Sequence, residues 1–192
     1  MDIFSILLLC FCGLIVVALG IVFFVIMLYN RLQQQNVLVN EAWSGIDVQL
    51  KKRFDLIPNL VETVKGYAKH EKELFEKVAE LRSGMMNAGA DPQKLGQLEG
   101  EFRSTLKTLF AVAENYPELK ANENFLSLQR SLQEIENELE SARRYYNGTV
   151  RDLNAKIVVF PNNIIAGWFN IKARQFFEVA NAAERENVKV QF

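Results

Sequence analysis

The residues from Ile3 to Asn30 carry no charged side chain, and most of them are apolar. A helix needs about 20 such residues to cross the hydrocarbon core of a bilayer. The segment is too long for a cleaved signal peptide, lacks a cationic start, and is not followed by a small-residue cleavage site. We therefore expect residues 1–30 to form an anchor that spans the bilayer once, with Ile3 to Leu28 in contact with lipid.

The charges on either side of this segment predict its orientation, because cytoplasmic flanks carry an excess of Lys and Arg. Only Asp2 precedes the segment, whereas Arg31 follows it directly and Lys51, Lys52 and Arg53 come later. We expect a very short N-terminus outside the membrane and the rest of the chain in the cytoplasm.

The residue types that most often carry chemistry are scarce outside this segment. Both cysteines, Cys10 and Cys12, lie within it, and His70 is the only histidine. No G-x-S-x-G nucleophile motif and no glycine-rich phosphate-binding loop occurs. The 22 Lys and Arg residues do not outnumber the 23 Asp and Glu residues, so the composition gives no reason to expect nucleic acid. We expect no enzymatic activity, no cofactor, no metal and no nucleic-acid partner.

Apolar residues after the anchor recur at steps of three and four, which predicts amphipathic helices. We expect four of them, at 39–78, 91–113, 115–157 and 162–183. Short connections between four such helices favour an all-α fold in which an antiparallel up-and-down four-helix bundle follows the transmembrane helix. The first and third helices are predicted to be long. The bundle would cover residues 31–186, and residues 187–192 would form a tail.

Local signals support the predicted boundaries. Asp91 before Pro92 is typical of a helix start, and Asn115 with Glu118 fits a capping box. The apolar stripe of the third helix stays in phase across Gly148, so we expect one continuous helix there.

The segment "QLKKRFDLIPNL", Gln49 to Leu60, combines several charges with a proline in a helical pattern. Pro58 has no N–H, and its ring clashes with the carbonyl of Phe54 in a regular helix. We expect a kink near Pro58. The backbone acceptor released there can be bound by a nearby Lys or Arg side chain.

The charged residues of this segment have two interpretations: a solvated face beside the kink, or a contact surface for another helix or another copy. The candidate contact residues are Asp47, Lys51, Arg53 and Asp55, together with Arg143, Arg144 and Arg151 of the third predicted helix. We hypothesise that Asp47 or Asp55 pairs with one of the last three arginines, within a chain or between chains.

Aromatic residues gather near the C-terminal end, at Phe160, Trp168, Phe169, Phe176 and Phe177. They could form a ligand-binding box, a surface that touches the membrane, or part of the core. Because Phe169 and Phe176 share a helical stripe, core packing is favoured. Phe177 lies off that stripe and is the candidate for an exposed contact.

Several blocks of the sequence resemble the LemA family of bacterial membrane-anchored proteins. They are "YNRL", "NEAWSGIDVQLKKRFDLIPNLVETVKGYAKHE", "LFAVAENYPELKAN" and "FPNNIIA", in this order. The resemblance implies an N-terminal transmembrane helix, a cytoplasmic antiparallel helical bundle and a bacterial source. We therefore expect the protein to be located in the bacterial inner membrane. The resemblance implies no established reaction.

Together these features favour a non-enzymatic, single-pass scaffold or adaptor that self-assembles through its helical bundle, because unequal helices leave apolar surface to cover. The alternative is a regulatory or signalling subunit that docks on another membrane protein such as a protease. The expected partners are the lipid bilayer along residues 3–28, a second copy of the chain, and in the alternative a different membrane protein.

Overall fold

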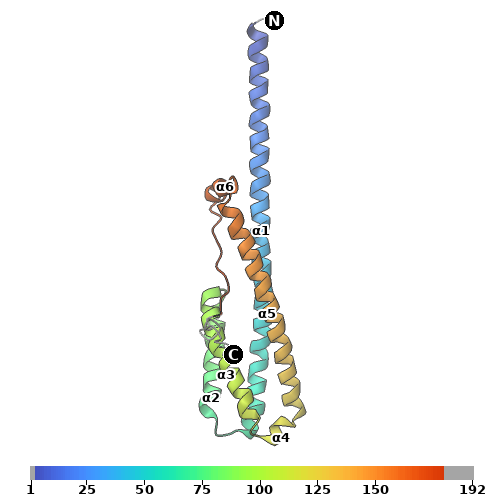
Figure 1. The fold of residues 1–192 in the computed structure, drawn as a ribbon, viewed down its shortest axis with the longest axis vertical. Coiled ribbons are helices and arrows are strands. Elements are labelled where there is room, and N and C mark those ends of the chain that lie inside the picture. Colours follow the sequence, from blue (N-terminus) through green and yellow to red (C-terminus); the bar gives the residue numbers. More distant parts are fainter. Residues whose placement is uncertain (1–2, 180–192) are drawn as a thin grey trace, which may run out of the picture. The chain divides into compact units, whose positions relative to one another are not determined.

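A computed structural model describes residues 3–179 of the chain (Figure 1). These residues contain no strand, which confirms the predicted all-α class. They form six helices rather than the four expected after the anchor. The helices are α1 (Ile3–Tyr67), α2 (Lys72–Ala88), α3 (Pro92–Ala113), α4 (Pro117–Lys120), α5 (Glu123–Val158) and α6 (Asn162–Trp168).

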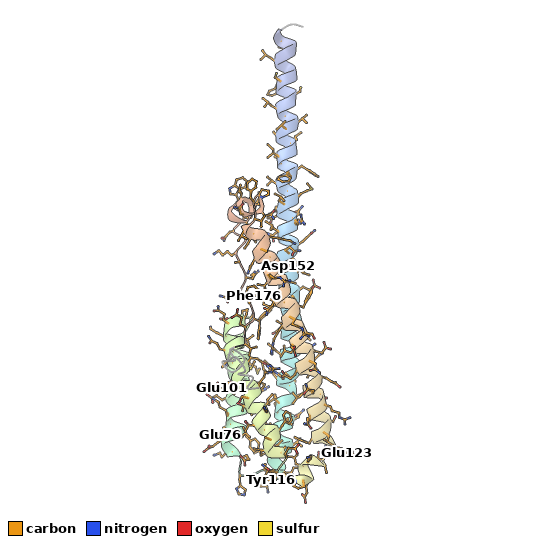
Figure 2. All side chains as sticks on the ribbon, viewed as in Figure 1. Glu76, Glu101, Tyr116, Glu123, Asp152 and Phe176 are labelled. Atoms are coloured by element: carbon orange, nitrogen blue, oxygen red, sulfur yellow. The ribbon has the colours of Figure 1, made fainter. Side chains whose placement is uncertain are left out.

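The charge-free segment forms the first part of α1. Among the residues that the structure describes, α1 alone is long and apolar enough to cross a membrane, and its most apolar part is not buried by the rest of the chain. Figure 2 shows side chains projecting outward along this part of the helix. The exposed large apolar side chains include Phe4, Leu7, Phe11, Leu14, Ile15, Val16, Val17, Leu19, Ile21, Val22, Phe23, Phe24, Ile26 and Met27. This uncovered apolar surface indicates association with a membrane.

The first predicted body helix, 39–78, is divided in two. α1 ends at Tyr67, and a tight turn through Ala68–Glu71 leads into α2. The Glu71 N–H donates to the Ala68 carbonyl at 3.3 Å. Val64, Ala68 and Phe75 are buried on both sides of the turn, so the apolar spacing continues through the break and does not signal it.

The helix starts are partly as predicted. Asp91 caps α3, because its side chain accepts hydrogen bonds from the N–H groups of Gln93 and Lys94. The capping box expected at Asn115 is wrong: Pro117 begins the short α4, and the side chain of Asn122 caps α5 by accepting from the Phe125 N–H at 3.0 Å. The continuous helix across Gly148 is confirmed, since α5 runs from Glu123 to Val158.

The fourth predicted helix is much shorter than expected. It ends at Trp168, and Asn170 has a φ of 53°, a conformation that asparagine tolerates better than most residues. Residues 169–179 form no helix. The remainder of the predicted helix and the tail 187–192 lie outside the described residues.

The chain divides into two compact units, and α1 and α5 contribute to both. Unit 1 comprises Met1–Glu41 and Thr149–Arg174; unit 2 comprises Ala42–Gly148 and Gln175–Phe192. The predicted boundary at residue 30 concerns the bilayer rather than the packing of the chain, and it stays a prediction.

In unit 1, α6 packs beside α1 (Figure 1). Leu32 of α1 is buried with Ile165 and Ala166 of α6. The Tyr29 and Phe169 rings have their centroids 4.4 Å apart.

In unit 2, α2 packs along α3. Side chains of both helices contact α1, and side chains of α3 also contact α5. Lys77 of α2 pairs with Glu101 of α3 at 2.8 Å, and Trp43 of α1 packs edge-on against Tyr146 of α5 with ring centroids 5.2 Å apart. The buried apolar residues of this unit include Ile46, Leu50, Ile57, Leu60, Val64, Val78, Leu81, Met85, Leu95, Phe102, Leu109, Leu119, Leu132 and Leu139. Glu76, Glu101 and Glu123 lie on its outer surface (Figure 2).

Candidate functional site: a buried arginine–glutamate network

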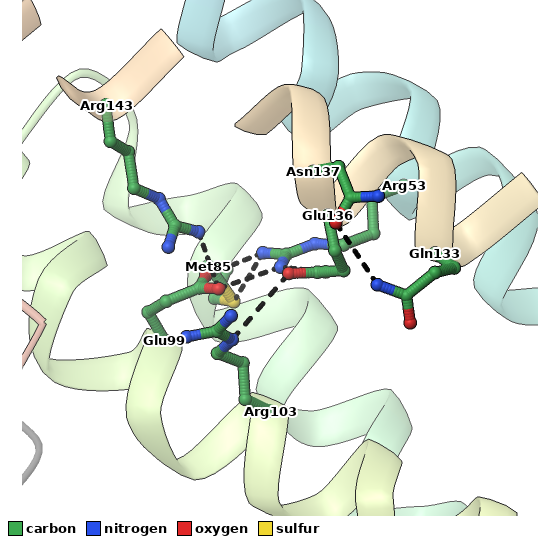
Figure 3. Close-up of polar contacts among 8 residues, drawn as sticks. All are labelled: Arg53, Met85, Glu99, Arg103, Gln133, Glu136, Asn137 and Arg143. Carbon is green, nitrogen blue, oxygen red and sulfur yellow. Dashed lines mark hydrogen bonds and ion pairs between the residues drawn. The ribbon is translucent and has the colours of Figure 1, made fainter. Parts of the chain in front are cut away.

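Glu99 of α3 is fully buried, yet both of its carboxylate oxygens have partners (Figure 3). Arg53 of α1 donates through Nη1 to Oε1 at 2.9 Å and through Nη2 to Oε2 at 2.7 Å. Arg143 of α5 donates through Nη2 to Oε1 at 2.6 Å. The contact with Arg53 is bidentate, the geometry in which a guanidinium binds a carboxylate most strongly.

Arg53 is fully buried and reaches three other helices of unit 2 (Figure 3). Besides binding Glu99, its Nη1 donates to Oε1 of Glu136 in α5 at 2.7 Å. Its Nη2 lies 3.9 Å from the sulfur of Met85 in α2, and its guanidinium lies 4.8 Å from the ring centroid of Phe102. Through this one side chain, α1 contacts α2, α3 and α5.

The charges of this network balance. Two guanidiniums, of Arg53 and Arg143, face two carboxylates, of Glu99 and Glu136. Arg103 adds a longer, partly exposed contact to Glu136 at 3.8 Å. Burying one such charge without a partner is very costly, so the four groups are stable in the interior only as a set.

The pKa of Glu99 reflects this pairing. Burial by itself would raise the pKa of the carboxyl group, but the charges and hydrogen bonds of Arg53 and Arg143 outweigh burial and hold it at about 2. Glu99 is therefore a carboxylate throughout the physiological pH range. It does not suit general acid–base catalysis, which requires a pKa near the working pH. Its oxygens are occupied by guanidiniums, so it is not free to bind a metal.

The contribution of Glu99 to the unfolding free energy should depend on pH. Because its pKa in the folded protein, about 2, lies below its ordinary value of 4.5, the pairing stabilises fully above pH 4.5 and is lost as the pH falls through 2. We expect the difference in unfolding free energy between the natural protein and Glu99→Gln to be constant between neutral pH and about pH 5, and to shrink at lower pH. Urea unfolding followed by circular dichroism checks this. A difference that persists undiminished through the acid range would contradict it.

The sequence-predicted contact residues divide into two groups. Arg53 and Arg143 come together through Glu99. Lys51 pairs with Asp55 at 3.1 Å on the exposed surface of α1. Arg144 pairs with Glu140, and Arg151 lies 3.6 Å from Asp152. No ion pair to Asp47 occurs within the part of the chain that the structure describes.

The hypothesis that Asp47 or Asp55 binds one of these arginines is thus wrong within one chain, because the arginines hold other acids. The same pairing between chains stays a prediction.

Glu99 and Glu136 were not among the predicted residues. A signal for Glu99 exists in the sequence, because Leu95, Glu99, Phe102 and Leu106 follow one another at steps of four, three and four. Arg53 is likewise in phase with Leu50 and Ile57, and Arg143 with Leu139 and Tyr146. A charged residue at a stripe position of each of three helices indicates a buried charge network.

Pro58 lies inside α1 and does not end the helix. The carbonyl oxygen of Phe54, which has no N–H partner at position 58, accepts a hydrogen bond from Nε of Arg82 at 2.8 Å. An arginine therefore binds the backbone acceptor that the proline releases, as predicted from the sequence. This hydrogen bond links α1 to α2. The kink itself stays a prediction.

Replacing Arg82 with methionine should leave the Phe54 carbonyl without its partner and lower the unfolding free energy by about 1–3 kcal/mol. In a Pro58→Ala background, the restored N–H at position 58 binds Phe54 instead, so the same change should cost less. Thermal or urea unfolding of the four proteins of this cycle measures the coupling. Equal costs in both backgrounds would contradict the assignment.

Within unit 2, residues 175–179 are bound by side chains of α5. Asn147 accepts from the Phe177 N–H at 2.8 Å and donates to the Phe177 carbonyl at 3.0 Å. Tyr146 donates to the Gln175 carbonyl at 2.9 Å. The expectation that Phe177 is exposed is wrong: its ring is buried, 5.0 Å below the guanidinium of Arg143 and 6.3 Å from the ring of Trp43.

Gly96 of α3 is the residue against which this segment rests. A Cβ atom at position 96 would lie 1.9 Å from the carbonyl oxygen of Glu178, too close to exist without movement. We expect Gly96→Ala to displace the segment and to lower the unfolding free energy by about 1–3 kcal/mol, as overpacking does. Gly148→Ala, where a Cβ meets no neighbour, is the matched control. Unfolding titrations measure both, and equal stability of the two variants would contradict the contact.

Comparison with known proteins agrees with the sequence and the fold. The model of the LemA family matches residues 42–192. Protein LemA of Metamycoplasma hominis is 27% identical over 176 residues, which cover 91% of this chain and 79% of that protein.

Other relatives have a different name. Magnetosome protein MamQ 2 of Paramagnetospirillum magneticum is 23% identical over 199 residues, covering 89% of this chain and 73% of its own. Magnetosome protein MamQ of Magnetospirillum gryphiswaldense is 22% identical over 166 residues, which cover 73% of this chain and 61% of that protein. Neither name states a reaction. Because the family model covers most of the chain, including the whole arginine–glutamate network, the predicted resemblance is confirmed, and this chain belongs to the LemA family.

Proposed function

We propose that this LemA-family protein is a non-enzymatic scaffold or adaptor, anchored by residues 3–28 in the bacterial inner membrane. The observation that carries the proposal is the apolar surface of α1, which no other described part of the chain covers. A bilayer supplies the cover that this surface lacks in water. In the proposed orientation, the N-terminus lies outside and the body lies in the cytoplasm, where the cations after the anchor favour it.

The non-enzymatic role is supported by how the buried polar groups are used. Arg53, Glu99 and Arg143 bind one another and join helices α1, α3 and α5. In a catalytic site such groups would face a cavity and have pKa values near neutrality. A body whose buried charged side chains pair with one another suits a role in which its outer surface does the binding. We propose that the helical segments of unit 2 act together as an antiparallel bundle of this kind.

Self-assembly is proposed through the outer charged residues of α1 and α5. Asp47, Lys51 and Asp55 lie on α1, and Arg144 and Arg151 lie on α5, all exposed. Pairs such as Lys51–Asp55 contribute little within a chain because they are solvated. Because they carry both signs, the exposed charges of one copy can pair with those of a second copy.

Co-expression of two full-length copies with different affinity tags tests this proposal. Purification through the first tag, in mild detergent, should recover the second copy. Reversing the charges of Asp47, Lys51 and Asp55 together should reduce recovery, whereas reversing Glu76 and Lys72 on α2, an equally exposed pair, should not. Recovery of no second copy would contradict self-assembly.

The same experiment addresses the alternative of a regulatory subunit. In that case one different membrane protein, in a fixed ratio, is recovered in place of the second copy. The exposed charges of α1 would then be the docking surface for that protein, and their reversal would release it.

A further inference from the structure

An exposed apolar surface surrounds α6 in unit 1. We name it the aromatic tip and define it as Val158, Val159, Phe160, Ile164, Trp168 and Phe169. Phe160 is 74% exposed and Trp168 is 71% exposed, and the other four are also exposed. A group of large apolar side chains that the chain leaves uncovered marks a binding surface.

The opposite face of α6 fixes the place of the aromatic tip along α1 (Figure 1). Ile165 and Ala166 are buried against Leu32, and Val25 and Leu28 pack against the same cluster. Val25 and Leu28 belong to the last two turns of the charge-free segment. The aromatic tip therefore lies beside the point where α1 leaves its apolar segment.

The chain beyond α6 leads away from this point and is held in place. Phe169 packs on Tyr29, and the Ile171 N–H donates to the Ala166 carbonyl at 2.9 Å. Arg174 then donates to Asn36, two helical turns further along α1 than Tyr29, at 2.8 Å. The aromatic tip is thus the part of this segment nearest to the apolar segment, and it is tethered on both sides.

The charges around the aromatic tip are of one sign. The sequence has no Asp or Glu between Leu153 and Arg174, whereas Lys156 and Lys172 flank the tip. Exposed tryptophan and phenylalanine beside lysine are typical of protein surfaces that lie at the headgroup level of a bilayer. Cations there are attracted by anionic lipids.

We propose that the aromatic tip inserts into the bilayer that α1 spans, at the boundary between headgroups and acyl chains. The leaflet concerned is the one that faces the helical body. This inference rests on the proposed anchoring of α1, since the position of the tip is defined by its contact with Val25 and Leu28. The tip gives the protein a second membrane contact, which restrains rotation and tilt of α1 at the membrane surface.

The two tryptophans of the chain allow a direct test. Trp168 lies in the aromatic tip, and Trp43 lies in unit 2 against Tyr146. Full-length Trp43→Phe, full-length Trp168→Phe and the natural protein are each assembled into nanodiscs of phosphatidylcholine and phosphatidylglycerol. Their fluorescence is measured with and without phosphatidylcholine brominated high on its acyl chains, and with aqueous iodide. Circular dichroism verifies that each variant is folded. If Trp43→Phe does not fold, the difference between the natural protein and Trp168→Phe gives the Trp168 signal.

We expect brominated lipid to remove most of the Trp168 emission and little of the Trp43 emission, and aqueous iodide to leave most of the Trp168 emission unquenched. If iodide but not bromine quenches Trp168 in protein that co-elutes with the discs, insertion of the aromatic tip is contradicted. Anchoring by α1 is then still supported. Protection of Trp168 from both quenchers would mean that a second copy or another protein covers the tip, which also overturns its insertion. Failure of the protein to co-elute with the discs would overturn the anchoring itself and this inference with it.

Discussion

Replacing Glu99 with glutamine is expected to lower the unfolding free energy by about 3–5 kcal/mol, because it leaves two buried guanidiniums without their shared counter-charge. Arg53 and Arg143 both donate to Glu99, and water compensates little because Arg53 is fully buried and Arg143 is only 7% exposed. Glutamine has nearly the same shape, so the loss reports charge and hydrogen bonding rather than a cavity. Urea unfolding followed by circular dichroism at neutral pH measures it.

A matched control lies two residues away on the same helix. Glu101 pairs with Lys77 at 2.8 Å, but its side chain is 52% exposed. We expect Glu101→Gln to change the unfolding free energy by about 0–1 kcal/mol, as is typical of surface pairs. Equal effects of the two substitutions would contradict the view that the network is a buried unit.

A combined apolar replacement separates the network's stability from any other role. Arg53→Met, Glu99→Leu and Arg143→Met together remove the three buried charges and leave the partly exposed Glu136 beside Arg103. Sets of this kind are often tolerated when volume is kept. We expect this variant to be more stable than Glu99→Gln alone. If it folds but no longer self-associates, the network also sets the helix register that the outer surface requires.

The second large effect is expected in the apolar segment of α1. Arginine at the centre of a transmembrane helix costs roughly 2.5–3.5 kcal/mol, so three together cost about 8–10 kcal/mol. Leu14, Val17 and Ile21 are all exposed and lie on one face of the helix. We expect the triple arginine variant to lose stable membrane insertion, and alkaline extraction of membranes followed by sedimentation measures this.

The control for the triple variant is an arginine elsewhere on the same helix. Val48 is 52% exposed and lies beyond the charge-free segment, so Val48→Arg should remain in the membrane pellet. Sedimentation of the triple arginine variant with the membranes after alkaline treatment would contradict the assignment of residues 3–28 as the anchor.

The all-α class and the long helices could be predicted because they follow from local signals. The charge-free segment, the cap at Asp91 and the unbroken stripe across Gly148 each act within a few residues of the structure that they specify. The break at Ala68–Glu71 has no such signal, since it contains neither glycine nor proline and the apolar spacing continues through it.

The non-helical course of residues 169–179 could not be predicted locally, because its causes lie elsewhere in the chain. Asn147 and Asn154 of α5 bind backbone groups of Phe177 and Arg174 and so compete with helix formation. The buried position of Phe177 likewise depends on Trp43 and Arg143, which are distant in sequence.

The candidate site was predictable in its cations and not in its acids. Arg143 is predicted because it lies one step from an apolar stripe, and Arg53 because it belongs to the charged segment Gln49 to Leu60. Glu99 can be identified only because it occupies a position of the apolar stripe of α3. Glu136 lies among several glutamates, and its spacing does not distinguish it from them. Which acid binds which arginine is decided by the packing of helices, which no single helix specifies.

The most direct test of the proposed function is the mass of the full-length protein, gently extracted in detergent or held in nanodiscs and measured by light scattering with the detergent or lipid contribution subtracted. We expect a defined complex that contains two or more copies, and a shift toward one copy when Asp47, Lys51 and Asp55 are reversed in charge. A single copy at every concentration, with no other protein bound, would contradict the proposal that this LemA-family protein is a self-assembling membrane scaffold.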